Sequence, residues 1–97
     1  MRIEDWRAEI DAIDEEIVRL LNMRTRLAVK VGMLKVAAGL PLSDLDRERE
    51  VLGRVSRANT GPLDDRAVLK LFRRIMRESR RVEARVVEGA MQTGVLQ

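Results

Sequence analysis

Apolar residues recur at every third or fourth position from near the start of the chain to Ala38. The positions on this period are Ile10, Ile13, Ile17, Leu20, Arg24, Leu27, Val31, Leu34 and Ala38. Such spacing is typical of one face of an α-helix, so we expect a helix over about residues 4–38. At about 1.5 Å per residue this helix is roughly 50 Å long, more than a compact domain of this size can cover. Part of it must pack on something else, and a second copy of the chain is the simplest partner.

Stop and start signals divide the remainder of the chain. Gly39 and Pro41 end the first helix, because glycine takes the left-handed cap and proline cannot continue the helix. Ser43 is then the expected N-cap of a second helix over about residues 44–57.

A third helix is expected over about residues 64–89, capped by Asp64 and followed by a frayed tail at residues 90–97. Its buried stripe is predicted to be Val68, Phe72, Ile75, Ser79, Val82 and Val86. No run of residues has the pattern of a strand. We therefore predict a single all-α domain over residues 1–97, with one long, one short and one long helix in an intertwined homodimeric bundle.

Composition excludes several kinds of chemistry. The chain has no Cys and no His, which excludes thiol nucleophiles, imidazole bases and zinc sites built from these residues. Its net charge of +3 comes from 19 basic and 16 acidic residues that are interleaved, and it has one Trp, one Phe and no Tyr. Nucleic-acid binding is therefore disfavoured. Without a signal peptide or a membrane-length apolar run, we expect a cytoplasmic protein.

Polar side chains interrupt the apolar stripes of all three helices. They are Arg24, Lys35, Arg47, Glu48, Ser79 and Glu83. An unpaired buried charge costs several kcal/mol, so Arg24 must meet an anion or lie at a solvent-reaching edge. Lys35 projects from nearly the same face, about 16 Å further along the helix. We interpret the set as a site that holds a small polyanion and promotes a rearrangement within it by positioning and electrostatics.

Each of these residues also has a structural interpretation. Lys35 could extend to solvent along the helix edge, Glu48 could pair with charged neighbours in the segment 47–50, and Ser79 could bond to a carbonyl one turn earlier. The arginines of the third helix are interpreted as a solvated face, and they are Arg73, Arg74, Arg77, Arg80, Arg81 and Arg85.

From Trp6 to about Glu83 the chain resembles the all-helical chorismate mutases. The segments that carry the resemblance are Arg7 to Asp14, Arg24 to Val29 leading to Lys35, Pro41 to Arg49, and Leu71-Phe72 leading to Glu78-Ser79. The linker with Asp46-Arg47-Glu48-Arg49, at its distance from Lys35, is the specific part of this signature.

The resemblance implies a Claisen rearrangement of chorismate to prephenate in aromatic amino acid biosynthesis, by a homodimer with two shared sites and no cofactor or metal. It also implies a role for each site residue: Arg7 and Arg24 bind the two substrate carboxylates, Lys35 donates to the ether oxygen, Glu48 accepts from the ring hydroxyl, Arg47 is a supporting cation, Ser79 helps to hold a carboxylate, and Asp44 lines the site partly through its backbone.

Arg7 and Arg24 are about 25 Å apart along one helix, so if Arg7 takes part it reaches the site of the other subunit. The alternative is that Arg7 is a surface residue next to Trp6. Glu83 stands where many family members have a glutamine that donates to the ether oxygen. An ionised carboxylate would repel the charge developing there, so we predict that Glu83 is protonated in the working enzyme.

Two alternatives remain open from the sequence. One is pyruvate elimination from isochorismate on the same scaffold, and the other is a non-enzymatic helical dimerisation or regulatory module.

Overall fold

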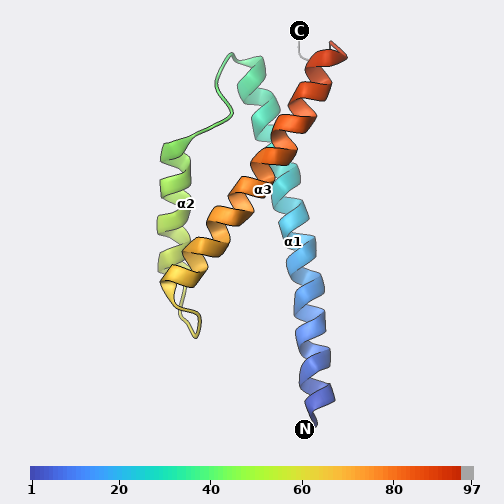
Figure 1. Ribbon diagram of the computed structural model, residues 1–97, viewed down its shortest axis with the longest axis vertical. Coiled ribbons are helices and arrows are strands. Elements are labelled where there is room, and N and C mark those ends of the chain that lie inside the picture. The colour runs from blue at the N-terminus through green and yellow to red at the C-terminus, as the bar shows by residue number, and fades with distance from the viewer. Residues whose placement is uncertain (95–97) are drawn as a thin grey trace.

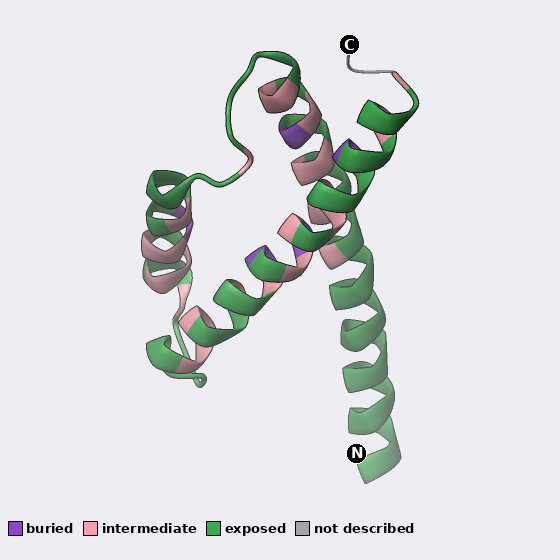
Figure 2. Ribbon diagram, turned by 45° about the horizontal axis from the view of Figure 1, so that its top comes forward, coloured by how far each residue is buried: buried purple, intermediate pink, exposed green. Residues whose placement is uncertain are grey.

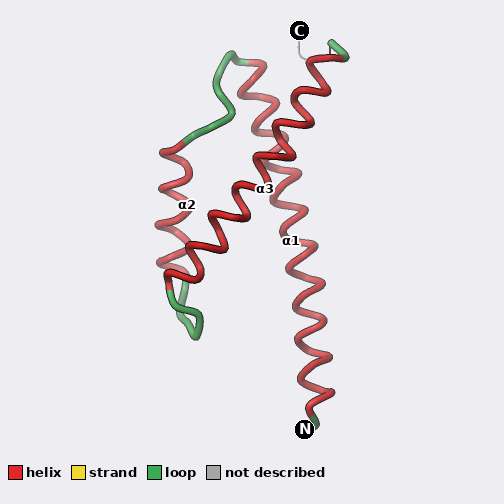
Figure 3. The backbone as a smooth tube through the Cα atoms, in the orientation of Figure 1, coloured by secondary structure: helices red, strands yellow, loops and turns green. Residues whose placement is uncertain are grey.

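The computed structural model describes residues 1–94, which form three helices and no strand (Figures 1 and 3). They are α1 (Ile3–Ala37), α2 (Leu45–Ala58) and α3 (Asp65–Gln92). The prediction of an all-α fold with one long, one short and one long helix is confirmed.

The helix ends follow local chemistry. Gly39 adopts a φ of +76° just beyond α1, as its cap requires. The prediction of Ser43 as the cap of α2 is wrong by one residue, because Asp44 accepts the backbone N–H of Arg47 at 3.0 Å. Asp64 caps α3 as predicted, accepting from Ala67 at 2.7 Å. The predicted tail is partly wrong, since α3 continues to Gln92; residues 95–97 lie outside the described part of the chain.

Helix α3 starts beside the end of α2, crosses α1 and packs on both, whereas α1 and α2 make no direct packing contact (Figure 1). The apolar side chains buried in this arrangement are Val51, Met76 and Val87. Most of the predicted stripe of α3 lies inward, since Ser79 is buried and Val68, Phe72, Ile75 and Val82 are half-buried. The prediction is wrong for Val86, which is 39% exposed, and it missed the buried Met76 and Val87. Because α1 and α2 stand apart, the space between them is open to a site.

Small residues of α1 make the contact with α3. Gly32 is buried, and a Cβ at this position would lie 3.1 Å from Cδ2 of Leu42 and 3.6 Å from a carboxyl oxygen of Glu83 on α3. The predicted apolar face of α1 is instead largely exposed within one chain, with Leu27 at 58% and Val31 at 54%. The crossing uses the neighbouring face, where Gly32 lies against Glu83 and Thr25 against Ser79.

The first half of α1 projects beyond the rest of the molecule, and residues 1–20 are all exposed (Figure 2). The apolar side chains Ile10, Ile13 and Ile17 have exposed fractions of 55%, 59% and 47%. The radius of gyration is 17.0 Å, against about 12–13 Å for a compact domain of this length. The excess length agrees with the expectation from the sequence that α1 is too long to be covered by its own chain.

None of the helices described in residues 1–94 has an apolar stretch long enough to cross a membrane.

Candidate active site

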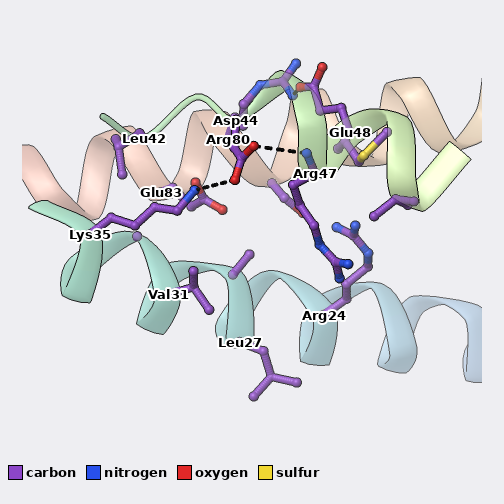
Figure 4. Close-up of a pocket in the computed structure, with 15 residues that line it drawn as sticks. Arg24, Leu27, Val31, Lys35, Leu42, Asp44, Arg47, Glu48, Arg80 and Glu83 are labelled. Atoms are coloured by element: carbon purple, nitrogen blue, oxygen red, sulfur yellow. Dashed lines mark hydrogen bonds and ion pairs between the residues drawn. The ribbon is translucent and has the colours of Figure 1, made fainter. Parts of the chain in front are cut away.

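A cavity of about 320 Å³ lies between α1 and α2, with α3 along its side (Figure 4). Its charged and hydroxyl lining comes from Arg24, Lys35, Asp44, Arg47, Glu48, Ser79, Arg80 and Glu83, and its apolar and glycine lining comes from Leu27, Ala28, Val31, Gly32, Leu42, Val51 and Met76. Seven of the eight site residues predicted from the sequence are therefore brought together in one place.

Arg24 and Arg47 approach each other across the cavity from α1 and α2 (Figure 4). Arg24 forms no ion pair with any side chain in residues 1–94, and Arg47 pairs with Glu50 of its own helix at 2.7 Å. Two guanidinium groups that face each other without a carboxylate between them repel, so the arrangement favours an anion there.

Asp44 fixes the other end of the cavity. One carboxylate oxygen caps α2, and the other accepts from the Lys35 ammonium at 3.4 Å. The bond from the Arg47 backbone N–H, together with Lys35, lowers the pKa of the Asp44 carboxyl despite some desolvation. The Asp44 side chain therefore ties Lys35 of α1 to the start of α2.

Glu48 pairs with Arg80, which reaches it from α3. The prediction that Arg80 belongs to a solvated face is wrong, because its side chain lines the cavity and is 39% exposed. The predicted pairing within residues 47–50 is present, but it joins Arg47 to Glu50 and leaves Glu48 to α3. Arg80 lies four residues after Met76 and three before Glu83. This helical spacing places it on the same inward face and could have predicted that Arg80 lines the cavity.

Ser79 is 3% exposed, and its hydroxyl lies 2.9 Å from that of Thr25 on α1. In the described residues the Ser79 hydroxyl forms no hydrogen bond to a backbone carbonyl one turn earlier, so the structural interpretation of Ser79 given above is wrong. Thr25 was not among the predicted site residues. Its pairing with Ser79 links α1 and α3 beside the cavity.

Glu83 has no ion-pair partner within residues 1–94, although it lines the same cavity as Lys35. Partial burial raises the pKa of the Glu83 carboxyl, and this effect is opposed by Lys35, Arg80 and Arg24 in that order. The direction agrees with the expectation that Glu83 holds a proton.

Arg7 is the predicted site residue that the single chain does not bring to the cavity. It lies on the exposed first half of α1, 17 residues before Arg24 and thus about 25 Å away along the axis.

The cavity combines four cations with three carboxyl groups, and the pKa of one of these, Glu83, is raised by burial. In the described residues no cluster of acids is placed to hold a metal ion. The lining can bind a small polyanion and stabilise negative charge that develops within it.

The family model "Chorismate mutase type II" matches residues 6–84. The chain belongs to this family. The match includes every cavity residue, from Arg24 to Glu83, and also Arg7.

Solved and curated chorismate mutases show the same relationship. The structure of chorismate mutase (form II) from Thermus thermophilus has a TM-score of 0.84 and 40% identity, over 88% of this chain and 97% of that chain. A bifunctional chorismate mutase/prephenate dehydratase of Aquifex aeolicus is 40% identical over an alignment of 78 residues that covers 76% of this chain. The chain spans only 22% of that relative's length. A chorismate mutase of Methanocaldococcus jannaschii is 25% identical over 90% of this chain and 89% of its own length.

Proposed function

We propose that this chain catalyses the rearrangement of chorismate to prephenate, an isomerase reaction of aromatic amino acid biosynthesis, and that it uses no cofactor. The observation that carries the proposal is the convergence of Arg24, Arg47 and Lys35 on one cavity of a chorismate mutase family member. Chorismate is a dicarboxylate, so its charge matches these cations. The reaction breaks and forms bonds within one molecule, which requires no nucleophile from the protein.

Substrate binding follows from the position of each group. Arg24, the cation without an ion-pair partner in residues 1–94, binds one carboxylate, with Arg47 as a supporting cation opposite it. Ser79 helps to hold a carboxylate from α3. Glu48 accepts a hydrogen bond from the ring hydroxyl. These contacts fold the enolpyruvyl arm over the ring, so that the two carbons that must join are already close.

The rate acceleration comes from stabilising the negative charge that develops on the ether oxygen of the substrate. Carbon–oxygen cleavage runs ahead of carbon–carbon bond formation, so negative charge grows on this oxygen in the transition state. Lys35 and protonated Glu83 donate to it from α1 and α3. Because this charge is small in the substrate and large in the transition state, the two donors favour the transition state over the bound substrate.

The functional unit in this proposal is a homodimer in which Arg7 of each chain completes the site of the other. The exposed apolar residues of α1 support this assembly, since Ile10, Ile13 and Ile17 have no cover from their own chain. Arg7 then binds the second carboxylate. The cytoplasmic location expected from the sequence stays a prediction.

The test is loss of chorismate absorbance, with prephenate identified as the product. We expect Arg24→Ala and Lys35→Ala each to lower kcat/KM by about 10²–10³, because each removes a charge that the cavity directs at the substrate. Lys70→Ala is the matched control, since Lys70 is exposed on α3 outside the cavity. Absence of turnover by the unaltered protein, or equal rates for Lys35→Ala and Lys70→Ala, would reject the proposal. Release of pyruvate from isochorismate would instead support the alternative lyase.

A further inference from the structure

The ion pair between Glu48 and Arg80 borders two hollows. On one side is the 320 Å³ cavity. On the other is a second cavity of about 190 Å³, whose lining includes Leu52, Arg73 and Arg77 together with the ion pair itself. Arg80 therefore does not extend freely into solvent, because it forms part of the wall between α2 and α3.

Glu48 depends on Arg80 for its charge balance. Its side chain is 27% exposed and shares the cavity with two other carboxyl groups, those of Asp44 and Glu83. Of the other cations that line these two cavities, Lys35 pairs with Asp44 and Arg47 with Glu50, and Arg24, Arg73 and Arg77 form no ion pair with Glu48 in residues 1–94. Arg80 is the partner that Glu48 has among residues 1–94. A partly buried carboxylate without such a partner tends to take up a proton or turn toward water.

We propose that Arg80 is a positioning residue that holds the Glu48 carboxylate in place at the edge of the cavity, and that it thereby selects a substrate whose ring carries a hydroxyl group facing Glu48. The inference rests on the proposed function, because it assigns the ring hydroxyl to Glu48.

The geometry of a carboxylate permits both contacts at once. Two carboxylate oxygens offer about four lone-pair directions, and a guanidinium occupies at most two of them. Arg80 approaches from α3, so the remaining directions can accept a hydrogen bond from a hydroxyl in the cavity. A lysine would supply the charge without the planar fork, so it would orient Glu48 less well.

The experiment compares Arg80→Met with Arg81→Met, each made alone, and adds Glu48→Gln and the double variant Glu48→Gln/Arg80→Met. Arg81 is a matched control because it is exposed, pairs with Glu78 at 3.0 Å and does not line the cavity. We expect Arg80→Met to raise KM for chorismate about tenfold with a smaller change in kcat, as loss of one hydrogen bond to a charged acceptor would. Arg81→Met should leave both constants near those of the unaltered protein. In the Glu48→Gln background, removal of Arg80 should have little further effect, because Arg80 acts through Glu48.

Fully additive losses in the double variant would overturn the inference, since they would show that Arg80 acts independently of Glu48. An Arg80→Met protein with the KM of Arg81→Met would also overturn it. If Arg80→Met loses helical content, Arg80→Gln carries the same comparison and the same rejection. Failure of the unaltered protein to convert chorismate would reject the proposed function, and with it this inference, whereas turnover with additive losses rejects the inference alone.

Discussion

Glu83 is subject to two opposing effects. Burial raises the pKa of its carboxyl group, and the charges of Lys35, Arg80 and Arg24 limit the rise. The neutral form is the one that can donate to an ether oxygen, because an ionised carboxylate only accepts. The balance therefore determines the pH range in which the site has two donors.

Activity should fall as pH rises through the raised pKa of Glu83. Below this pKa the carboxyl group keeps its proton and donates, and above it the ionised group repels the charge on the ether oxygen. Glu83→Gln should flatten this limb, because an amide donates at every pH. The check is kcat/KM for chorismate from mildly acidic to alkaline pH in both proteins. A level profile for the unaltered protein, or the same falling limb in Glu83→Gln, would contradict the assignment.

Most of the individual site residues could be predicted from the sequence, because each is a polar residue at a position where the helical pattern is otherwise apolar. Arg24, Glu48 and Ser79 are of this kind, and the structure places all three at the cavity. Arg80 was missed because it lies among many arginines on α3 and its partner is on another helix. Helical spacing shows which face a residue occupies, but it does not show which distant residue will meet it.

At the scale of the helices, Asp44 joins the start of α2 to the end of α1. Its carboxylate caps α2 and pairs with Lys35. The pKa of this carboxyl is lowered, so its contribution to stability is present above the ordinary carboxyl pKa and is lost as pH falls through the lowered value.

Asp44→Ala should therefore weaken both the fold and the site. Loss of the cap should lower the ratio of folded to unfolded protein roughly fivefold near neutral pH, and Lys35 should lose its anchor, which lowers kcat/KM. Urea unfolding followed by circular dichroism measures the first effect, and a chorismate assay measures the second. Asp46→Ala is the control, because the Asp46 side chain is 96% exposed and only loosely paired with Arg49. Equal unfolding curves for the two variants would contradict the role of Asp44.

Helix ends were predictable to within about three residues because Gly39, Asp64 and the linker carry strong local signals. The buried face was harder to predict. The sequence stripe of α1 turned out to be exposed within one chain, since α3 packs on the neighbouring face where Gly32 allows close contact. Periodicity alone does not distinguish a face that meets another helix of the same chain from one that remains for a partner.

At the scale of the whole molecule, the exposed first half of α1 separates Arg7 from every other predicted site residue. Two inactive variants should therefore complement each other. In a mixed dimer of Arg7→Ala and Lys35→Ala chains, one site carries both substitutions and the other carries neither.

Mixing and refolding the two variants in equal amounts should restore about a quarter of the unaltered activity, because half of the random pairs are mixed and each mixed pair has one intact site. The measurement is the rate of chorismate loss per chain. The control is a mixture of Arg24→Ala and Lys35→Ala. Both residues belong to the site of their own chain, so each site of a mixed dimer carries one substitution and activity should not recover. No recovery in the first mixture would contradict a shared site.

The small number of buried apolar side chains has a further consequence. Among residues 1–94, the buried apolar side chains are Val51, Met76 and Val87, which give a single chain a small core. In the proposed homodimer the second chain would supply much of the buried apolar surface, so folding and assembly would be a single event. The midpoint of thermal unfolding should rise with protein concentration. On dilution, the helical structure and the catalytic activity should be lost together.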